Sequence, residues 1–501
     1  EVIVRLMSLS WSLDNAAEHA GLSACEKSLS LNAIMMIKKI RTELVLRALF
    51  LLLLASASVN ADAVDRLVRE RMEERNIPGA AVAVIRNGKT EKVKGYGLAS
   101  LEFQAPVTPD TVFEIGSVSK QMTAAGILLL VQDGKVRLDE KISAYLPGTP
   151  ESWGNVTLRH LLTHTSGIKS YTGLTGFELS RRLSMEQFIK QLSPHPLEFV
   201  PGEKNIYSNS GYNLLAYVIE TQSGKKYMDF MRERIFRPLG MNRTGDRDPQ
   251  FIIPLRSSGY EWRIDRYTGR DGSLTDLMGA GSITSTIEDM IKWESALRGD
   301  AFLKPETKRE MWTQFTFNNG TRSVYGLGWR ISDVRGHKLI GHTGQTAGFG
   351  AAIFRYVDQD VTVIVLTNLG ELGMGSLIAT SLAKKYIPSL SIKNIREVDG
   401  DDVSRNARFL DALRLRIANR PDESTLTPEL FRAVSSPRAK AANDRAARFG
   451  EIRRLRFAGA EIIENKSVYR YVAEAEKRSM LWRFSLDPDG RISEMTLEED
   501  E

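Results

Sequence analysis

The sequence contains a serine and a lysine at a spacing that could support nucleophilic catalysis. Ser117 precedes an apolar run, residues 122–131 (MTAAGILLLV), which has no polar stripe and therefore predicts a buried helix. Ser117 would lie in the first turn of that helix, where unpaired backbone N–H groups collect. Lys120 follows one turn later on the same side, so its amine can reach the hydroxyl. A desolvated lysine can act as the base that makes a serine nucleophilic.

This spacing is not specific on its own, because roughly one or two S-x-x-K matches are expected by chance in a chain of this length. Three others occur, beginning at Ser166, Ser223 and Ser381. Glycine directly follows the first two serines, which is typical of a turn or a helix end. The third lies late in an apolar helical run. Only Ser117 opens a buried helix, and position alone leaves a catalytic serine and an ordinary helix start equally open.

A second candidate stretch is Tyr207-Ser-Asn209, which holds the only Tyr-x-Asn among the 14 tyrosines. It lies in a polar segment before an apolar helix. A turn whose side chains hydrogen-bond the backbone would explain this stretch by itself. The functional alternative places the phenol of Tyr207 beside Ser117 and Lys120, with Asn209 contacting the substrate carbonyl and the lysine.

A third candidate is His342-Thr-Gly344, which we expect at the end of a strand over residues 338–342. A strand edge beside a cleft can offer backbone N–H groups to an extended substrate, and Gly344 permits close approach. A strand end with a histidine buried in the core is the simpler explanation for this tripeptide in isolation.

Taken together and in this order, the three stretches resemble the catalytic motifs of the serine β-lactamase-related superfamily. The resemblance is greatest to the branch of class C β-lactamases, D-Ala-D-Ala carboxypeptidases, D-aminopeptidases and family VIII esterases. Four surrounding phrases also match that branch: 113–120 (FEIGSVSK), 158–167 (LRHLLTHTSG), 207–212 (YSNSGY) and 238–241 (PLGM). The similarity covers about residues 62–386 and does not extend to the C-terminal part of the chain.

The resemblance implies a set of functional residues. The catalytic residues would be Ser117, Lys120 and Tyr207, and the substrate-binding residues would be Asn209, His342, Thr343, Gly344 and Gln345. Ser117 would be acylated, with Lys120 and Tyr207 acting together as base and then as acid; which of them takes the first proton is left open. The backbone N–H groups of Ser117 and Gln345 would form the oxyanion hole.

One residue departs from the pattern of the β-lactamases and carboxypeptidases, which carry Lys-Thr-Gly where this chain has His342. We expect this histidine to be charged only in part near neutrality. The sequence therefore predicts an exported serine hydrolase, peptidase- or esterase-like, that cleaves an amide, ester or β-lactam. Two alternatives stay open: a β-lactamase or D-Ala-D-Ala carboxypeptidase proper, and a catalytically silent penicillin-binding-like sensor or scaffold.

Other chemistries find little support. The formal net charge is +6, but the basic residues are dispersed, so we expect no nucleic-acid partner; the expected partner is a small-molecule or peptide substrate. His160 and His164 have i, i+4 spacing but lack the adjacent glutamate of a zinc motif, so we expect them to pack within one short helix. The sequence contains neither Gly-x-Ser-x-Gly nor a phosphate-binding loop, and we expect no cofactor. The oligomeric state is not defined.

The N-terminal residues predict processing. Residues 1–34 have no core pattern and read as a non-native upstream extension, and residues 35–61 have the basic, apolar and small-residue regions of a signal peptide. An uncleaved membrane anchor is the alternative. The only cysteine is Cys25, so a chain cleaved after Ala61 would have no thiol and no disulfide. We expect a periplasmic or secreted protein with no stable membrane span in the mature chain.

The predicted fold class is α/β (α+β): an antiparallel sheet flanked by helices plus a helical lobe, with the β-lactamase/transpeptidase-like architecture that the resemblance implies. This serine hydrolase domain would span residues 62–386. A linker, 387–402, and a small α+β domain of unknown role, 403–501, would follow. We expect strands over 80–86 and 89–95, joined by an Asn87-Gly88 turn, and over 326–331, 338–342, 349–356 and 361–367. Helices are expected over 62–76, 159–164, 212–221, 285–297 and 372–386.

Overall fold

The computed structural model describes residues 63–500, apart from 176, 178–181, 249, 271, 273–276, 464 and 465. The predicted upstream extension and signal peptide, residues 1–61, lie outside the described residues. The chain divides into one unit of residues 1–67 and a second of residues 68–501. Of the first unit only residues 63–67 are described, and they begin a helix that continues to residue 74.

A seven-stranded antiparallel sheet is the central element, with the strand order β3-β2-β1-β12-β11-β10-β9. Its strands are β1 (Gly79–Arg86), β2 (Lys89–Ser100), β3 (Ala105–Pro106), β9 (Arg330–Val334), β10 (His337–Gln345), β11 (Gly350–Tyr356) and β12 (Val361–Thr367). Ala80 pairs with Thr367 and Arg86 with Val361. The early and late strands therefore share one sheet, which confirms the predicted fold class.

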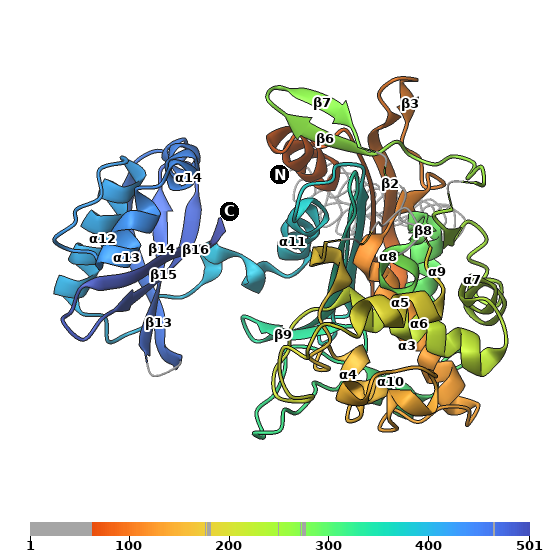
Figure 1. Ribbon diagram of the computed structural model, residues 1–501. Coiled ribbons are helices and arrows are strands. Elements are labelled where there is room, and N and C mark those ends of the chain that lie inside the picture. Colours follow the sequence, from red (N-terminus) through yellow and green to blue (C-terminus); the bar gives the residue numbers. More distant parts are fainter. Residues whose placement is uncertain are drawn as a thin grey trace, which may run out of the picture. The chain divides into compact units, whose positions relative to one another are not determined.

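The alternation of side chains along β1 explains how the sheet is covered. Ala81, Ala83 and Ile85 join the same core cluster as the buried apolar residues of α9 (Ile287–Arg298). The alternate residues of β1 point to the opposite face, because successive side chains in a strand alternate. Helix α11 (Met374–Tyr386) packs against β11 and β12, and Figure 1 shows it beside the sheet.

Two strands next to the site have other boundaries than predicted. The chain over 326–329 forms a turn, and β9 begins only at Arg330, because Gly326 and Gly328 are used for close packing. A Cβ on Gly328 would lie 2.9 Å from the carbonyl oxygen of Lys120. In addition, β10 does not end at His342 but continues to Gln345.

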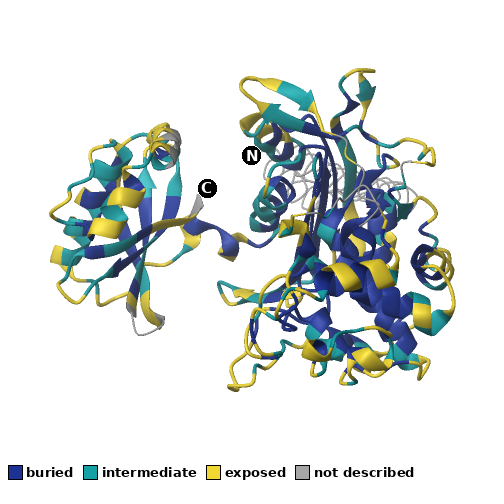
Figure 2. Cartoon of the chain, viewed as in Figure 1, coloured by how far each residue is buried: buried dark blue, intermediate teal, exposed yellow. Residues whose placement is uncertain are grey.

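The helical lobe surrounds a helix that is buried on every side. Its helices are α3 (Ser119–Gln132), α4 (Leu158–Leu162), α5 (Met185–Leu192), α6 (Asn209–Ser223), α7 (Tyr227–Met231), α8 (Met278–Gly281), α9 and α10 (Pro305–Met311). All residues from Ser119 to Leu130 are buried, as the apolar run predicted, and Figure 2 colours the central helices accordingly. Short strands also occur here: β8 (Ile283–Ser285) pairs with β4 (Phe113–Glu114) on one side and β5 (Gly245–Asp246) on the other, and β6 (Tyr260–Arg263) pairs with β7 (Arg266–Gly269).

The C-terminal residues form a separate hydrophobic core between helices and a four-stranded antiparallel sheet. The elements are α12 (Val403–Ile417), α13 (Pro428–Val434), α14 (Pro437–Ala447), β13 (Ile452–Ile463), β14 (Lys466–Ala475), β15 (Ser479–Leu486) and β16 (Ile492–Asp500). Phe409 of α12 stacks on Phe484 of β15, with ring centroids 4.4 Å apart. The helices and strands agree with the predicted α+β content, while the boundaries at 387, 402 and 403 stay predictions.

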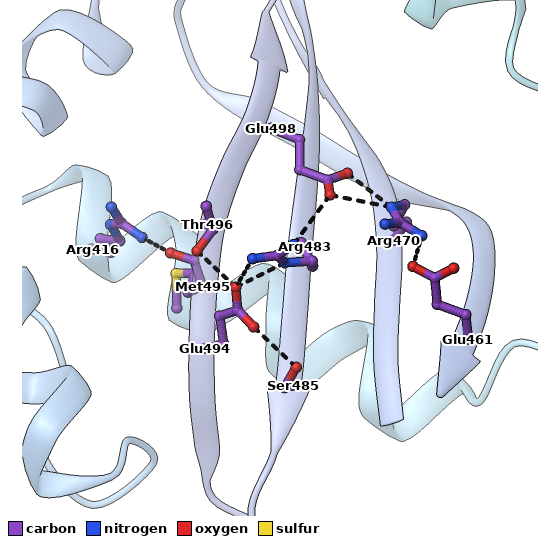
Figure 3. A network of polar contacts seen from close by, with 9 residues as sticks. All are labelled: Arg416, Glu461, Arg470, Arg483, Ser485, Glu494, Met495, Thr496 and Glu498. Carbon is purple, nitrogen blue, oxygen red and sulfur yellow. Dashed lines mark hydrogen bonds and ion pairs between the residues drawn. The ribbon is translucent and has the colours of Figure 1, made fainter. Parts of the chain in front are cut away.

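Charged side chains form a ladder on the face of this sheet that points away from its core (Figure 3). Arg470 of β14 pairs with Glu461 and, at 2.9 Å, with Glu498. Arg483 of β15 donates to Glu494 at 2.8 Å and lies 3.8 Å from Glu498. Each guanidinium in this ladder therefore meets two carboxylates.

Candidate active site

The position of Ser117 depends on two glycines that allow two elements to touch. Ser117 lies in the 3₁₀ turn Gly116–Val118, which leads directly into α3. Gly116 has a φ of +50°, and a Cβ there would lie 2.7 Å from the amide nitrogen of Gln345. A Cβ on Gly344 would lie 1.9 Å from the carbonyl oxygen of Ile115. Only glycines at both positions let β10 lie directly against the serine turn.

Lys120 lies beneath Ser117 and is completely buried. Its Nζ is 3.1 Å from Ser117 Oγ, and it donates to Asn209 Oδ1 at 2.8 Å and to the Ala280 carbonyl oxygen at 2.7 Å. None of these three partners carries a charge. Because the ammonium form is desolvated, and no carboxylate of the described residues contacts it, burial holds the pKa of Lys120 well below its usual range.

Tyr207 covers this lysine. Lys120 Nζ lies 4.7 Å from the centroid of the Tyr207 ring. Burial of the phenol group raises the pKa of Tyr207, and a hydrogen bond with the Ser117 hydroxyl opposes the shift. The residue as a whole is 42% exposed, so a substrate can reach the ring from the cleft.

His342 is buried, and hydrogen bonds to both ring nitrogens fix its tautomer. Nδ1 lies 2.6 Å from the Thr343 carbonyl oxygen, which can only accept, so Nδ1 carries the proton. Nε2 then accepts from the hydroxyl of Tyr325 at 2.6 Å. Burial, together with the nearby Lys120, lowers the pKa of His342 to about 3. The sequence-based expectation of a partly charged histidine is therefore wrong: the ring is neutral near neutrality.

A cavity of about 360 Å³ opens above these groups. It is lined by Ser117, Tyr207, Arg330, His342, Thr343, Gly344, Gln345, Ala351, Leu372, Gly373, Gly375 and Ser376. Lys120 and Asn209 are absent from this lining but bond to one another next to Ser117. The structure thus brings together every residue that the sequence analysis named for the site.

Sequence reasoning missed Arg330, Tyr325 and His164. Arg330 is an exposed cation in the cavity wall, and no ion pair to it occurs among the described residues. Its position in the wall depends on where β9 begins, which the local pattern did not reveal. Tyr325 could not be assigned to the site from the sequence, because only its hydrogen bond with His342 distinguishes it from other buried tyrosines.

The two histidines considered for zinc binding do not share one helix as expected. His160 lies in α4 and accepts the backbone N–H of Thr157 through Nδ1 at 3.2 Å. His164 follows the end of α4 and has a left-handed φ of +59°. Within the described ranges, no group of three His, Cys, Asp or Glu side chains is arranged to hold a metal ion.

No helix among the described residues is both long and apolar enough to cross a bilayer.

Residues 64–383 match the family model described as Beta-lactamase. The chain belongs to this family. It is accordingly a serine hydrolase of the β-lactamase fold, as the resemblance of the motifs predicted. The family match covers the sheet and the helical lobe and ends before the C-terminal α+β region.

Among characterised relatives, the chain is 31% identical over 322 residues to penicillin-binding protein 4* of Bacillus subtilis (strain 168), covering 60% of this chain and 70% of that protein. It is 30% identical over 312 residues to D-aminopeptidase of Brucella anthropi, covering 61% of this chain and 59% of that protein. The chain therefore spans well under two thirds of the D-aminopeptidase.

Solved structures of similar fold support the architecture. D-amino acid amidase from Ochrobactrum anthropi SV3 has 26% identity and a TM-score of 0.56, covering 65% of this chain and 99% of that chain. The octameric penicillin-binding protein homologue from Pyrococcus abyssi has 21% identity and a TM-score of 0.58, covering 88% of this chain and 100% of that one. The second likeness concerns the fold alone.

Proposed function

We propose that this enzyme cleaves amide bonds through an acyl-enzyme on Ser117, with Lys120 as general base and Tyr207 as general acid. The observation that carries the proposal is the arrangement around Lys120 Nζ, which is 3.1 Å from the serine hydroxyl and buried without a counter-ion. Such surroundings favour the neutral amine over the ammonium form. A neutral amine can accept the serine proton.

The hydrogen bonds of Lys120 determine where its lone pair points. A neutral amine has two N–H groups and one lone pair. Asn209 Oδ1 and the Ala280 carbonyl oxygen can only accept, and they take both N–H groups. The lone pair is left for the third partner, so the Ser117 hydroxyl donates to Lys120 and not the reverse. This arrangement supports Lys120 as the first base, the point that the motif left open.

Tyr207 completes the proton transfer. Because the pKa of its phenol is raised, the hydroxyl stays protonated and can donate to a leaving nitrogen. Ser117 Oγ would bond to the substrate carbonyl carbon as its proton moves to Lys120. The C–N bond would then break as Tyr207 protonates the amine, and Lys120 would return a proton to the phenolate. Attack by water on the ester would release the acid and restore Ser117.

The strand β10 supplies the remaining binding groups in this proposal. The N–H groups of Ser117 and Gln345 would hold the developing oxyanion, since Gly116 and Gly344 bring the turn and the strand into contact. Asn209, Thr343 and Gly344 would position the substrate, with neutral His342 held by Tyr325.

We also propose export, which the signal-like pattern of residues 35–61 supports.

The choice of amide substrates is supported by the names of the relatives, a D-aminopeptidase and a D-amino acid amidase. A hydrolysis panel of D-alanyl p-nitroanilide, p-nitrophenyl esters and nitrocefin tests this choice, with Ser117→Ala as the control. We expect the anilide to be cleaved with a larger kcat/KM than nitrocefin, because neutral His342 offers no ammonium to a β-lactam carboxylate. Faster turnover of nitrocefin than of the anilide would overturn the amide proposal.

A second candidate activity, release of a C-terminal residue, is favoured by Arg330. This guanidinium lines the cavity, is exposed, and forms no ion pair among the described residues. Arg330 is therefore placed to bind a substrate carboxylate in the role that His342 cannot fill. Hydrogen bonds to charged groups contribute about 1.5–3 kcal/mol. We expect Arg330→Gln to raise KM about ten- to a hundredfold for a peptide ending in a free carboxylate and to leave KM for its C-terminal amide unchanged. Equal KM changes for both peptides would exclude the carboxylate-binding role.

A further inference from the structure

His164 makes three contacts with three consecutive residues that include the proposed acid. Its backbone carbonyl accepts the N–H of Ile206 at 3.0 Å. Its ring lies over the ring of Tyr207, with centroids 4.3 Å apart and an interplanar angle of 38°. Its Nδ1 accepts the N–H of Ser208 at 3.1 Å. One residue outside the proposed catalytic set therefore holds Tyr207 and both of its neighbours.

The residues on either side of His164 also form hydrogen bonds with the loop that carries Tyr207. The Thr163 carbonyl accepts from the side-chain amide of Asn205 at 2.7 Å. The Thr165 carbonyl accepts the N–H of Gly202 at 2.8 Å. The loop that carries Tyr207 is thus attached along its length to the turn after α4.

His164 adopts a backbone conformation that a histidine rarely adopts. Its φ of +59° is left-handed, and a non-glycine residue keeps such a conformation only where its surroundings hold it. The side chain is 1% exposed. Because Nδ1 accepts a hydrogen bond, the proton of the neutral ring is on Nε2, which has no hydrogen-bond partner among the described residues. Burial, with the nearby Lys120, holds the pKa of His164 well below its usual range, so the ring stays uncharged.

We propose that His164 is a positioning residue that fixes the phenol of Tyr207 for proton donation to the leaving group. The inference rests on the proposed function, because it assumes that Tyr207 is the acid. The acceptor nitrogen sets the path of the backbone at Ser208, and the ring sets the tilt of the phenol. The left-handed backbone of His164 lets its carbonyl oxygen and its ring both face residues 206–208.

Leaving groups of different basicity provide the test. An anilide or amide nitrogen must be protonated to leave, whereas p-nitrophenolate leaves without an acid. His164→Phe keeps an aromatic ring but removes the acceptor. We expect His164→Phe to lower kcat for D-alanyl p-nitroanilide at least tenfold more than kcat for D-alanyl p-nitrophenyl ester, with KM little changed. His164→Asn restores an acceptor and tolerates a left-handed φ, so we expect it to recover most of the anilide activity that His164→Phe loses.

A double-mutant cycle with Tyr207→Phe separates this proposal from the proposed function. If His164 acts through the phenol, His164→Phe should lower the anilide rate less than twofold further in the Tyr207→Phe background. Equal losses on anilide and ester, or an undiminished effect in that background, would overturn the positioning role. If Tyr207→Phe alone shows no selective loss on the anilide, the assignment of Tyr207 as the acid fails instead. Should His164→Phe not fold, His164→Gly, which relieves the left-handed backbone and removes both side-chain contacts, takes its place with the same expectations.

Discussion

Basic side chains gather both around the cleft at Ser117 and on the outer face of the C-terminal sheet, but their partners differ in charge. Around the cleft, Lys120, His164 and His342 are buried, and among the described residues their hydrogen bonds are to uncharged groups. On the sheet, Arg470 and Arg483 are partly exposed and each meets two carboxylates.

This difference separates groups that can do chemistry from groups that contribute to structure. Burial without a counter-ion disfavours the protonated form of a base, so its lone pair becomes available at a lower pH than in water. An arginine that faces glutamates on a partly exposed surface keeps its charge, and such pairs contribute little to stability.

The largest effect is expected from removing the buried amine. Lys120→Ala should lower kcat/KM for D-alanyl p-nitroanilide at least a hundredfold, because the serine loses its base. The matched control is Lys226→Ala, which removes an exposed lysine from another S-x-x-K sequence and should leave kcat/KM unchanged. Steady-state kinetics of both variants provide the measurement, and near-native activity of Lys120→Ala would refute its role as base.

The lowered pKa of Lys120 also predicts the pH dependence of the rate. The lysine must be deprotonated to accept the serine proton, so kcat/KM should rise with pH through the pKa of Lys120 and then level off. Because burial holds that pKa well below 10.5, the plateau should begin far below pH 10.5. A rate that keeps rising up to pH 10.5 would mean that the lysine is charged in the free enzyme.

A moderate effect is expected in the stability of the fold at acidic pH. The pKa of His342 is about 3 in the folded chain against 6.5 for an ordinary histidine. Between these values the unfolded chain binds the proton and the folded chain does not, so stability should fall as pH drops from 6.5 toward 3. Thermal unfolding at pH 7 and pH 4.5 should show a smaller loss of Tm for His342→Asn than for the unmodified protein. An equal loss in both would show that His342 does not contribute.

The smallest effect is expected on the sheet. Arg483→Ala breaks contacts with Glu494 and Glu498, yet its side chain is 32% exposed. We expect the free energy of unfolding to fall by about 1 kcal/mol or less, with the difference shrinking as salt screens the charges. Denaturant titrations at low and high ionic strength measure this effect. A loss of several kcal/mol would show that the ladder is a structural core rather than a solvated surface.

The sequence predicted the parts of the site that local pattern controls. The apolar run after Ser117 correctly predicted a helix buried on all sides. Strand-forming segments early and late in the domain correctly predicted one sheet, which β1 and β12 share. The order of three short motifs predicted which distant segments meet. These features depend on periodicity and on residues adjacent in the chain.

The remaining features depend on tertiary neighbours that no local pattern contains. Gly326 and Gly328 resemble part of a strand but are needed for close packing on α3, so Arg330 could not be located in the cavity wall. The charge state of His342 follows from its burial and from Tyr325, which is distant from any motif. His164 appeared to be a helix residue until its left-handed turn and its contact with Tyr207 were known.

Covalent labelling of Ser117 tests the central claim most directly. Intact-protein mass spectrometry after treatment with a fluorophosphonate should show a single adduct, and peptide mapping should locate that adduct on Ser117. The account predicts labelling that is lost in Ser117→Ala and strongly slowed in Lys120→Ala. Absence of an adduct in the unmodified protein, or equal labelling of Ser117→Ala, would contradict it.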